Sequence, residues 1–510
     1  MSSSGTVSKK GKRHGKKSKS HRYDTMTSSH KLQEKQLMES VNASSEKNEE
    51  ETGRASKWFL TGLFGLANFG MGASTVAIGM ILLDLQLLTD TTSSDTAWAF
   101  TAKAIGLLLG IAITGFSQSC LHIHILGMSW LFAGSLVALP FCRGLISLVG
   151  VFIPIGISYV SIYSVGTICM AALWKQKKSS SLYFITACGY IGYVISPALS
   201  YPFTTDYYRN WTEVSTNVTV NKTAKGNWFE TLALSNTTMS ETIISEIQWK
   251  MFTLLAIVGG VVAASGTFIF FSACCFCRDI FQVPSAVDDD SVEEEAKTRH
   301  STGVVCFFIL VGGCVQLIGD GQKLGLAESY LKTFLSRHLE LTKVSGVIAV
   351  TIFTGSHVAW AAFGKYIQRN SGSSVLFFIM VVFNIAGASV LMISDQSFVL
   401  FCVGCALIGV GLSAKSACLV IWVKAVIGDE VFIIYTSYLS WAVGDIAFAN
   451  LIGHLIDDKP FTFVYVIFGG SVAMLLAFVV GHIGFIAVFK TKGQPLATTL
   501  RPLFIKERTG

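Results

Sequence analysis

The chain has 510 residues, of which 51% are hydrophobic and 14% are charged, whereas charged residues make up roughly a quarter of a soluble domain. This composition disfavours a water-soluble fold. The formal net charge is +7. We expect no nucleic-acid partner for a chain of this composition. Only 8 residues are proline, which favours long helices over a barrel with many turns.

The amino-terminal segment, residues 1–55, has almost no apolar content and carries eight Lys or Arg before its first acid, Asp24. We interpret it as a disordered, basic cytoplasmic tail. It lacks the apolar core of a cleaved signal peptide, so insertion through the first span is expected. The basic cluster is either solvated or in contact with anionic lipid.

Long apolar runs dominate the rest of the chain. A hydrocarbon core about 30 Å thick is crossed by roughly 20 apolar residues in a helix. We therefore predict an all-α polytopic membrane protein with twelve transmembrane helices. The predicted spans are 57–84, 96–118, 121–142, 145–173, 181–203, 250–275, 302–325, 343–367, 373–393, 397–424, 431–456 and 462–489.

Basic residues in the short loops predict the orientation of these spans. They place both termini in the cytoplasm; the loop with Lys332, Arg337 and Lys343 opposes this orientation, because it lies on the outer side. The supporting residues are Lys175, Lys177, Lys178, Lys365, Arg369, Lys424, Lys490 and Lys492.

The polar loop 204–249 supports the same orientation. It contains four N-glycosylation sequons, and glycosylation requires an extracellular or lumenal face. A plasma-membrane location is expected, and a lysosomal membrane would have the same topology. The acceptor residues are Asn210, Asn217, Asn221 and Asn236.

An acidic cytoplasmic linker, 276–301, divides the chain into two six-helix halves, 56–275 and 302–489, and a cytoplasmic tail, 490–510, follows. A shift of the sequence by 248 residues relates the two halves. Parallel six-helix repeats are typical of alternating-access transporters, whose substrate binds where the halves meet. The aligned pairs are Trp174 with Trp422, Phe184 with Phe432, Ile185 with Ile433, and Tyr190 with Tyr438.

The cysteines do not indicate a metal or disulfide scaffold. Cys402 and Cys405 have the spacing of a metal pair but lie within an apolar run, so we expect neither a metal site nor a cofactor. Cys274, Cys275 and Cys277 end a span and are either structural or palmitoylated.

Several motifs occur in a fixed order along the chain: Gly79–Thr89, Phe100–Gly106, Pro140–Cys142, Leu173–Lys175 with Gly192, Pro197 and Ala198, and Gly444-Asp445. Together they resemble the major facilitator superfamily, and within it the branch of the sodium-dependent glucose transporters, the major facilitator domain-containing 4 branch. The resemblance implies two six-helix halves and sodium-coupled uptake of glucose or a related hexose. It covers most of residues 57–490.

The chain departs from this family pattern at several positions. Met80 stands where the family has proline, and Lys103 where it has arginine. Residues 115–120 lack the charged signature expected between the second and third spans, and the family acid of the seventh span is displaced to Asp320. These departures bear on sugar selectivity and sodium coupling rather than on the fold.

Charges inside a bilayer carry a penalty of at least about 2.5–3.5 kcal/mol and therefore mark candidate functional residues. Asp445 could bind Na⁺ or carry a proton, or it could form a structural pair with Lys415. His357 is a further candidate for ion coupling, or it is a packing histidine. Asp84 and Lys103 could form a structural pair or a gate.

The seventh span contains a polar cluster among glycines, which we interpret as a sugar site. Polyols require several fixed hydrogen-bonding groups, and one left buried and unpaired costs about 1–3 kcal/mol. Trp360 and Trp441 could provide an apolar wall for a pyranose ring, or they are packing residues. The polar candidates for the substrate are Gln316, Asp320, Gln322 and Lys323.

Neither a nucleotide-binding loop nor a catalytic constellation is recognisable in the sequence, so neither a pump nor an enzyme is expected. The preferred interpretation is a monomeric carrier that binds a small molecule, a sugar, in the lipid bilayer, with Na⁺ as the co-transported ion. The alternatives are a proton-coupled carrier or uniporter of another organic solute, and a non-transporting receptor or scaffold with the same fold.

Overall fold

The computed structural model describes residues 56–117, 120–174, 178–204, 241–275, 302–338, 342–371, 373–394, 397–413 and 430–491. The chain divides into units 1–59 and 60–510, and the contacts below lie within the second. The amino-terminal tail 1–55, the acidic linker, several predicted site residues and residues 492–510 lie outside the described residues, and residues 490–491 of the predicted carboxyl-terminal tail belong to the last helix instead. These site residues are Asn210, Asn217, Asn221, Asn236, Lys415 and Cys277.

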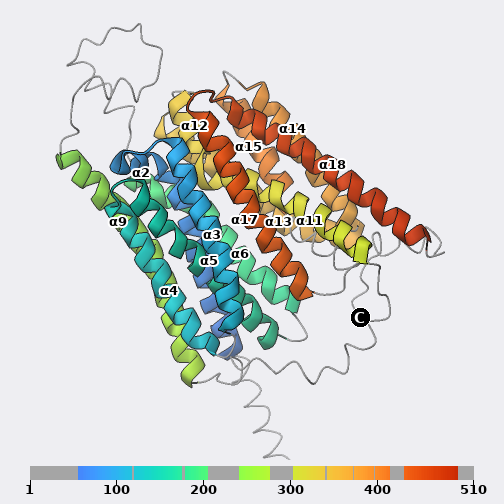
Figure 1. Cartoon of the computed structure of the whole chain (residues 1–510), viewed down its shortest axis with the longest axis horizontal. Helices are drawn as coiled ribbons and strands as arrows, with labels where there is room; N and C mark the ends of the chain where they lie inside the picture. The colour runs from blue at the N-terminus through green and yellow to red at the C-terminus, as the bar shows by residue number, and fades with distance from the viewer. Residues whose placement is uncertain are drawn as a thin grey trace, which may run out of the picture. The chain divides into compact units, whose positions relative to one another are not determined.

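Regular structure in the described ranges is helical throughout (Figure 1). The first-half elements are the first helix (Ser56–Met80), α2 (Leu82–Thr89), α3 (Ser93–Phe116), α4 (Leu121–Ala138), η2 (Leu139–Phe141), α5 (Leu145–Leu173), α6 (Lys178–Ser200), η3 (Tyr201–Phe203) and α9 (Glu241–Cys275). The second-half elements are α11 (Thr302–Lys323), η5 (Leu324–Ser329), α12 (Leu331–His338), α13 (Lys343–Ser371), α14 (Ser373–Met392), α15 (Phe398–Leu412), α17 (Glu430–Ile456) and α18 (Thr462–Thr491).

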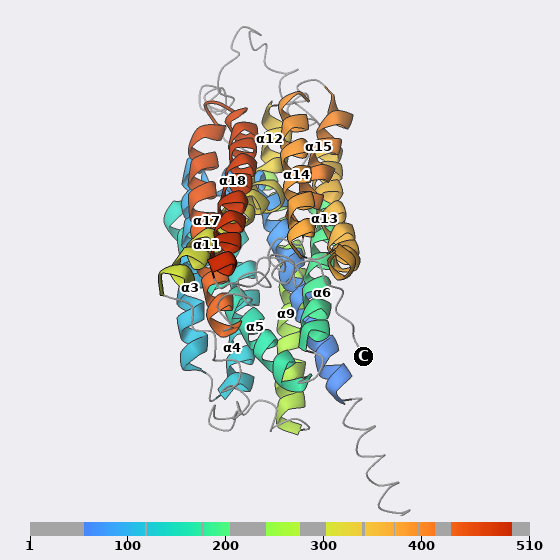
Figure 2. The same ribbon diagram turned by 90° about the vertical axis from the view of Figure 1, so that its right-hand side faces the viewer.

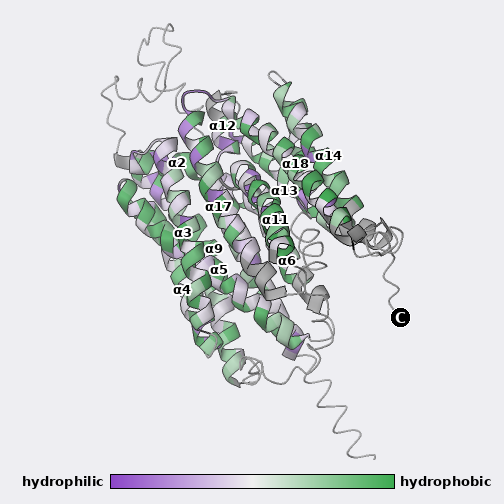
Figure 3. Cartoon of the chain, turned by 45° about the vertical axis from the view of Figure 1, so that its right-hand side comes forward, coloured by the Kyte–Doolittle hydropathy of each residue, from purple (hydrophilic) through white to green (hydrophobic). Residues whose placement is uncertain are grey.

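Eleven of these helices are long and apolar enough to cross a membrane, counted over the described residues. The predicted tenth span, 397–424, is described only to residue 413, where it forms the shorter apolar helix α15. Hydrophobic residues, in green, recur along the labelled helices (Figure 3). The prediction of an all-α, multi-pass membrane protein is confirmed.

Equivalent helices pack in the same way in the two halves. In the first half α3 packs on α5 and α4 on α9, and in the second half α13 packs on α15 and α14 on α18 (Figures 1 and 2). Glycine permits close approach in both the α3–α5 pair and the α13–α15 pair. A Cβ added at Gly156 would lie 2.0 Å from the Lys103 carbonyl oxygen, and one at Gly409 would lie 2.4 Å from that of Phe353.

The first span differs from its predicted bounds of 57–84. The helix ends at Met80, and α2 begins after Ile81, whose φ of −98° and ψ of 6° interrupt the helical geometry. The Met80 carbonyl, at the carboxyl end of the first helix, accepts a hydrogen bond from the ammonium of Lys332 on α12. The side chain of Lys332, from the second half, therefore stabilises the interruption between the first helix and α2.

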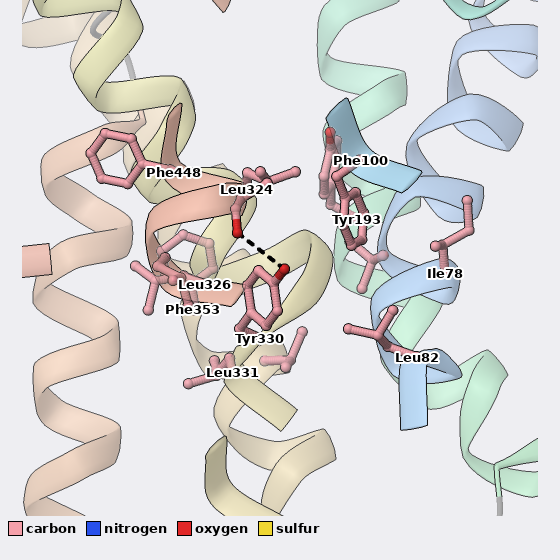
Figure 4. Packing of buried hydrophobic residues seen from close by; sticks show 14 of the residues in the cluster. Ile78, Leu82, Phe100, Tyr193, Leu324, Leu326, Tyr330, Leu331, Phe353 and Phe448 are labelled. Carbon is pink, nitrogen blue, oxygen red and sulfur yellow. Dashed lines mark hydrogen bonds between the residues drawn. The ribbon is translucent and has the colours of Figure 1, made fainter. Parts of the chain in front are cut away.

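One buried apolar cluster extends through both halves. Around η5 it includes Ile78, Leu82 and Phe100 of the first half together with Leu324 and Tyr330 of the second (Figure 4). The Phe100 and Tyr330 rings lie 6.2 Å apart, and the Tyr330 hydroxyl donates to the Ala449 carbonyl at 3.3 Å. This packing positions the carboxyl end of α11, which carries the predicted substrate residues.

Candidate functional site

A cavity of about 150 Å³ lies between the two halves. Its lining comes from the first helix, α5 and α6 on one side and from α11, α13, α15 and α17 on the other. The lining residues are Asn68, Gly72, Tyr159, Tyr163, Thr186, Gly189, Tyr190, Tyr193, Gln316, Asp320, Lys323, His357, Leu412, Ser437, Tyr438 and Trp441.

Helix α11 presents three polar side chains to the cavity, Gln316, Asp320 and Lys323. Their spacings of four and three residues place them on one helical face. The Gln316 amide donates to a carboxylate oxygen of Asp320. Gln316 and Asp320 are buried, with 6% and 8% of their surface exposed, so this pair is held away from bulk solvent at the cavity wall.

Two tyrosines of α6 surround the ammonium group of Lys323. The nitrogen donates to the Tyr193 hydroxyl at 3.0 Å and lies 4.3 Å from the centre of that ring. It lies 5.8 Å from the centre of the Tyr190 ring. A cation over an aromatic face is stabilised by about 0.5–2 kcal/mol, depending on its desolvation. This contact joins the two halves at the level of the cavity.

Aromatic rings meet across the remaining wall. Tyr159 and Trp441 have ring centres 5.6 Å apart, and Tyr163 and Tyr438 have centres 6.1 Å apart, both edge to face. His357 packs edge to face on Tyr190 at 4.9 Å. The cavity therefore combines hydroxyl groups with flat apolar surfaces.

Gln322 does not line the cavity, although the sequence made it a substrate candidate. Its amide nitrogen donates to the Ile467 carbonyl at 2.7 Å and to the Ser471 hydroxyl at 3.1 Å, both on α18. Its amide oxygen accepts from Asn384 of α14 at 3.0 Å. The side chain faces away from the first half because Gln322 lies about 100° around the helix from Lys323, and these bonds tie α11 to its own half.

Trp360 also lies outside the cavity lining. Its ring contacts Phe363 at 5.3 Å and Phe383 at 5.5 Å, between α13 and α14. Only one of the two predicted tryptophans, Trp441, lines the cavity.

Of the described ion-coupling and gate candidates, only some line the cavity. His357 lines the cavity, whereas Asp445, with 1% of its surface exposed, does not belong to the lining. Asp445 follows Gly444, where a Cβ would lie 2.3 Å from the Leu317 carbonyl oxygen, so α17 is tightly packed on α11 there. Asp84 and Lys103 are both buried, at 0% and 4% exposure.

Contacts between α3 and α17 close one end of the space between the halves, which we call the Ser93 end. The Asp457 carboxylate accepts from the Ser93 N–H at 3.0 Å and from its hydroxyl at 2.8 Å. Ser93 is the first residue of α3, where the N–H groups lack helical partners and the dipole favours negative charge. Towards the cavity, the Asn450 amide donates to the Thr101 hydroxyl at 2.7 Å.

Two lysines of the second half complete the Ser93 end. Lys332 donates to the carbonyl of Met80, and Lys343 donates to the carbonyl of Thr204, just beyond η3. The Lys343 ammonium also lies 4.6 Å from the centre of the Tyr201 ring. The charged groups of Asp457, Lys332 and Lys343 thus all contact backbone groups at helix ends of the first half. The negative charge lies at an amino-terminal end and the positive charges lie at carboxyl-terminal ends, as the helix dipole favours.

The tyrosines of the cavity were not identified from the sequence as site residues. Tyr190 and Tyr438 appeared there only as an aligned pair of the internal repeat. Both line the cavity, at equivalent positions of the two halves. A polar aromatic residue repeated in both halves is the signal that could have found them.

No family model matches the chain. Over 153 residues the chain is 27% identical to sodium-dependent glucose transporter 1 of Rattus norvegicus, a match that covers 30% of this chain and 32% of that protein. It is 26% identical over 168 residues to major facilitator superfamily domain-containing protein 4A of Homo sapiens, covering 32% and 31%. The chain thus spans about a third of the length of the curated relatives that it matches.

Similarity to solved structures extends over most of the chain. The xylose transporter XylE from E. coli, in a partially occluded inward-open conformation, superposes with a TM-score of 0.57 at 12% identity, covering 86% of this chain and 99% of that one. The nucleoside transporter NupG gives a TM-score of 0.54 at 10% identity, covering 84% and 99%. The chain has the major facilitator fold.

A third structure with this fold is a bacterial homolog of the human lysosomal transporter Spinster, in an inward-facing conformation. Its TM-score is 0.51 at 12% identity, and the match covers 86% of this chain and 97% of that one. The resemblance to the major facilitator superfamily inferred from the sequence motifs is therefore confirmed at the level of the fold.

Proposed function

We propose that this protein is a secondary transporter that carries a neutral, hydroxylated ring solute, a hexose in the first instance, by alternating access. The observation that carries the proposal is the polar and aromatic cavity between the halves, beyond which the Ser93 end is closed. A substrate site between repeated halves, accessible from one side at a time, is the arrangement that alternating access requires.

The chemistry of the cavity favours a neutral solute. Among its lining residues Asp320 and Lys323 carry opposite formal charges, so a neutral ligand leaves the charges of the cavity balanced. The rings of Tyr159 and Trp441 offer a flat wall, and cavities of about 150 Å³ hold a single six-membered ring. The names of the similar proteins, a glucose, a xylose and a nucleoside transporter, support the same class of solute.

The Ser93 end is the outer end in this proposal, and the carrier faces the cytoplasm. The loop lysines and sequons of the sequence support that orientation and a plasma-membrane location. The inward-open and inward-facing states of the similar XylE and Spinster-type structures also agree with it. Both chain termini are then cytoplasmic.

Uptake by expressing cells tests the proposal, with labelled glucose and labelled uridine as parallel probes. Trp441→Ala removes a ring that lines the cavity, and we expect uptake at low solute concentration to fall about fivefold, since such a ring contact contributes about 0.5–1.5 kcal/mol. Trp360→Ala is the matched control, because it removes the same ring outside the cavity. Uptake is normalised to surface expression.

Uptake of glucose supports the hexose carrier, and uptake of uridine alone shifts the proposal to a nucleoside carrier. If neither probe enters the cells above the level of untransfected cells, transport of this solute class is excluded. The interpretation as a non-transporting receptor or scaffold is then favoured. Equal losses in the two tryptophan variants would contradict the assignment of the cavity as the substrate site.

Sodium coupling is a separate part of the proposal, with Asp445 as the ion-coupling residue. A buried carboxylate in a span offers oxygen ligands to Na⁺, and each charge that crosses the membrane field contributes about 2.3 kcal/mol per 100 mV. We expect Asp445→Asn to abolish the stimulation of uptake by external Na⁺ while uptake in choline medium persists. Sodium stimulation that survives in this variant rules out Asp445 and leaves proton coupling or uniport to be tested.

A further inference from the structure

Helix α11 separates hydrogen-bond acceptors from donors along one face of the cavity. The Gln316–Asp320 pair provides a carboxylate, which when ionised only accepts hydrogen bonds, and Lys323 provides an ammonium, which only donates them. Residues three apart on a helix have Cβ atoms about 5–6 Å from each other. An acceptor group and a donor group are therefore presented to a ligand within one helical turn.

The acceptor side of this pair is fixed in place. Gln316 donates to one oxygen of Asp320 from the preceding turn, and both side chains are buried. An ionised carboxylate has room for about four hydrogen bonds on its two oxygens. Asp320 can hold Gln316 and still accept from a hydroxyl group in the cavity.

The donor side shows what kind of group it accommodates. The Lys323 ammonium has three N–H groups and directs one of them to the hydroxyl of Tyr193 across the cavity, at 3.0 Å. The acceptor in this contact is a hydroxyl oxygen, the same chemical group that a sugar presents. The half-buried lysine thus already donates a hydrogen bond to a hydroxyl group of the other half.

We propose that Asp320 and Lys323 together recognise a vicinal diol. One hydroxyl donates its proton to the Asp320 carboxylate, and the oxygen of the adjacent hydroxyl accepts from the Lys323 ammonium. This assignment rests on the proposed transport function and specifies its substrate chemistry. A solute that lacks either hydroxyl leaves one buried charged group without its ligand, and sites of this kind discriminate strongly against such analogues.

Two classes of solute carry this group, pyranose sugars and nucleosides, whose ribose has adjacent hydroxyls. The diol site is the chemistry common to both. The rest of the cavity, with its wall of Tyr159 and Trp441, determines whether the part of the solute next to the diol is a pyranose ring or a nucleobase. Binding must be measured with both a sugar and a nucleoside to show which of these two classes the protein binds.

The experiment is equilibrium binding to the purified full-length protein in lipid nanodiscs. The probes are glucose against 2-deoxyglucose and 3-deoxyglucose, and uridine against 2′-deoxyuridine. In the wild type we expect removal of one hydroxyl of the recognised diol to weaken binding about tenfold or more. In Lys323→Met and in Asp320→Asn we expect binding of the diol to weaken and this preference to fall to about twofold or less.

Trp360→Ala is the matched control. It removes a ring that lies outside the cavity lining, between α13 and α14, and keeps both arms of the diol site. We expect it to bind the diol and to prefer it over the deoxy analogues as the wild type does. A general loss of structure would affect all three variants alike.

The outcomes separate this inference from the proposed function. Binding of glucose or uridine with an undiminished diol preference in Lys323→Met and Asp320→Asn overturns the diol site and leaves the transport proposal standing. If the wild type binds a deoxy analogue more tightly than the parent glucose or uridine, the diol site is also overturned and the transport proposal stands. Binding of neither glucose nor uridine overturns both.

Discussion

Replacing Gly156 with alanine is expected to reduce the thermal stability of the protein sharply and to lower the yield of folded protein. The added methyl group would lie 2.0 Å from the carbonyl oxygen of Lys103 and 2.9 Å from the N–H nitrogen of Leu107. Both are backbone atoms, so α3 and α5 must separate. Overpacking of this kind costs typically about 1–3 kcal/mol and sometimes more, and α5 also carries the cavity residues Tyr159 and Tyr163.

The measurement is the melting temperature of the purified protein together with its monodispersity in detergent. Gly150→Ala is the matched control, since it lies on the same helix with no heavy atom within 4 Å of an added Cβ. We expect that variant to be neutral or slightly stabilising, because alanine favours the helix over glycine by about 1 kcal/mol. Equal melting temperatures for the two variants would show that α3 and α5 are not in the described contact.

Replacing Asp457 with alanine is expected to open the Ser93 end. The carboxylate accepts two hydrogen bonds from Ser93 of the other half, and it lies at the favourable end of the α3 dipole. Hydrogen bonds to a charged group contribute about 1.5–3 kcal/mol each. Because Asp457 is only half-buried, we expect a loss of about 1–2 kcal/mol and a population shift of roughly five- to thirtyfold.

Pulsed electron spin resonance can detect this shift. Spin labels at Phe141 and Lys459, exposed residues of the two halves, are attached in a background without native cysteines. The Asp457→Ala variant should add a longer-distance population. Asp458→Ala, which removes the neighbouring exposed carboxylate, should leave the distance distribution unchanged. If both variants keep the wild-type distribution, Asp457 does not hold this end closed.

The lysines Lys332 and Lys343 show where reasoning from the sequence reached its limit. Counted as loop charges, they opposed the predicted orientation. In the structure both are directed at backbone carbonyls of the first half, Met80 and Thr204. A charge count treats every lysine as free to interact with lipid, and it has no means of recognising one that is engaged in a tertiary contact.

The candidate site was predicted in part. Gln316, Asp320 and Lys323 could be found because polar residues in an apolar span are costly wherever they point. Their neighbour Gln322 met the same criterion but bonds within its own half to Ile467. The cavity tyrosines escaped notice because tyrosine is found both at lipid interfaces and in packed cores, so its presence in a span does not by itself indicate a site.

The sequence by itself determined the class of the protein, the location of most of its helices and the division into two repeated halves. These follow from local composition, because a backbone in hydrocarbon must satisfy its hydrogen bonds within a helix, whatever surrounds it. Only the tertiary structure decided which helical face meets the cavity, which charges close the Ser93 end and where the first helix breaks. Each of these depends on a partner in the other half, distant in the sequence, as Tyr193 is for Lys323 and Met80 is for Lys332.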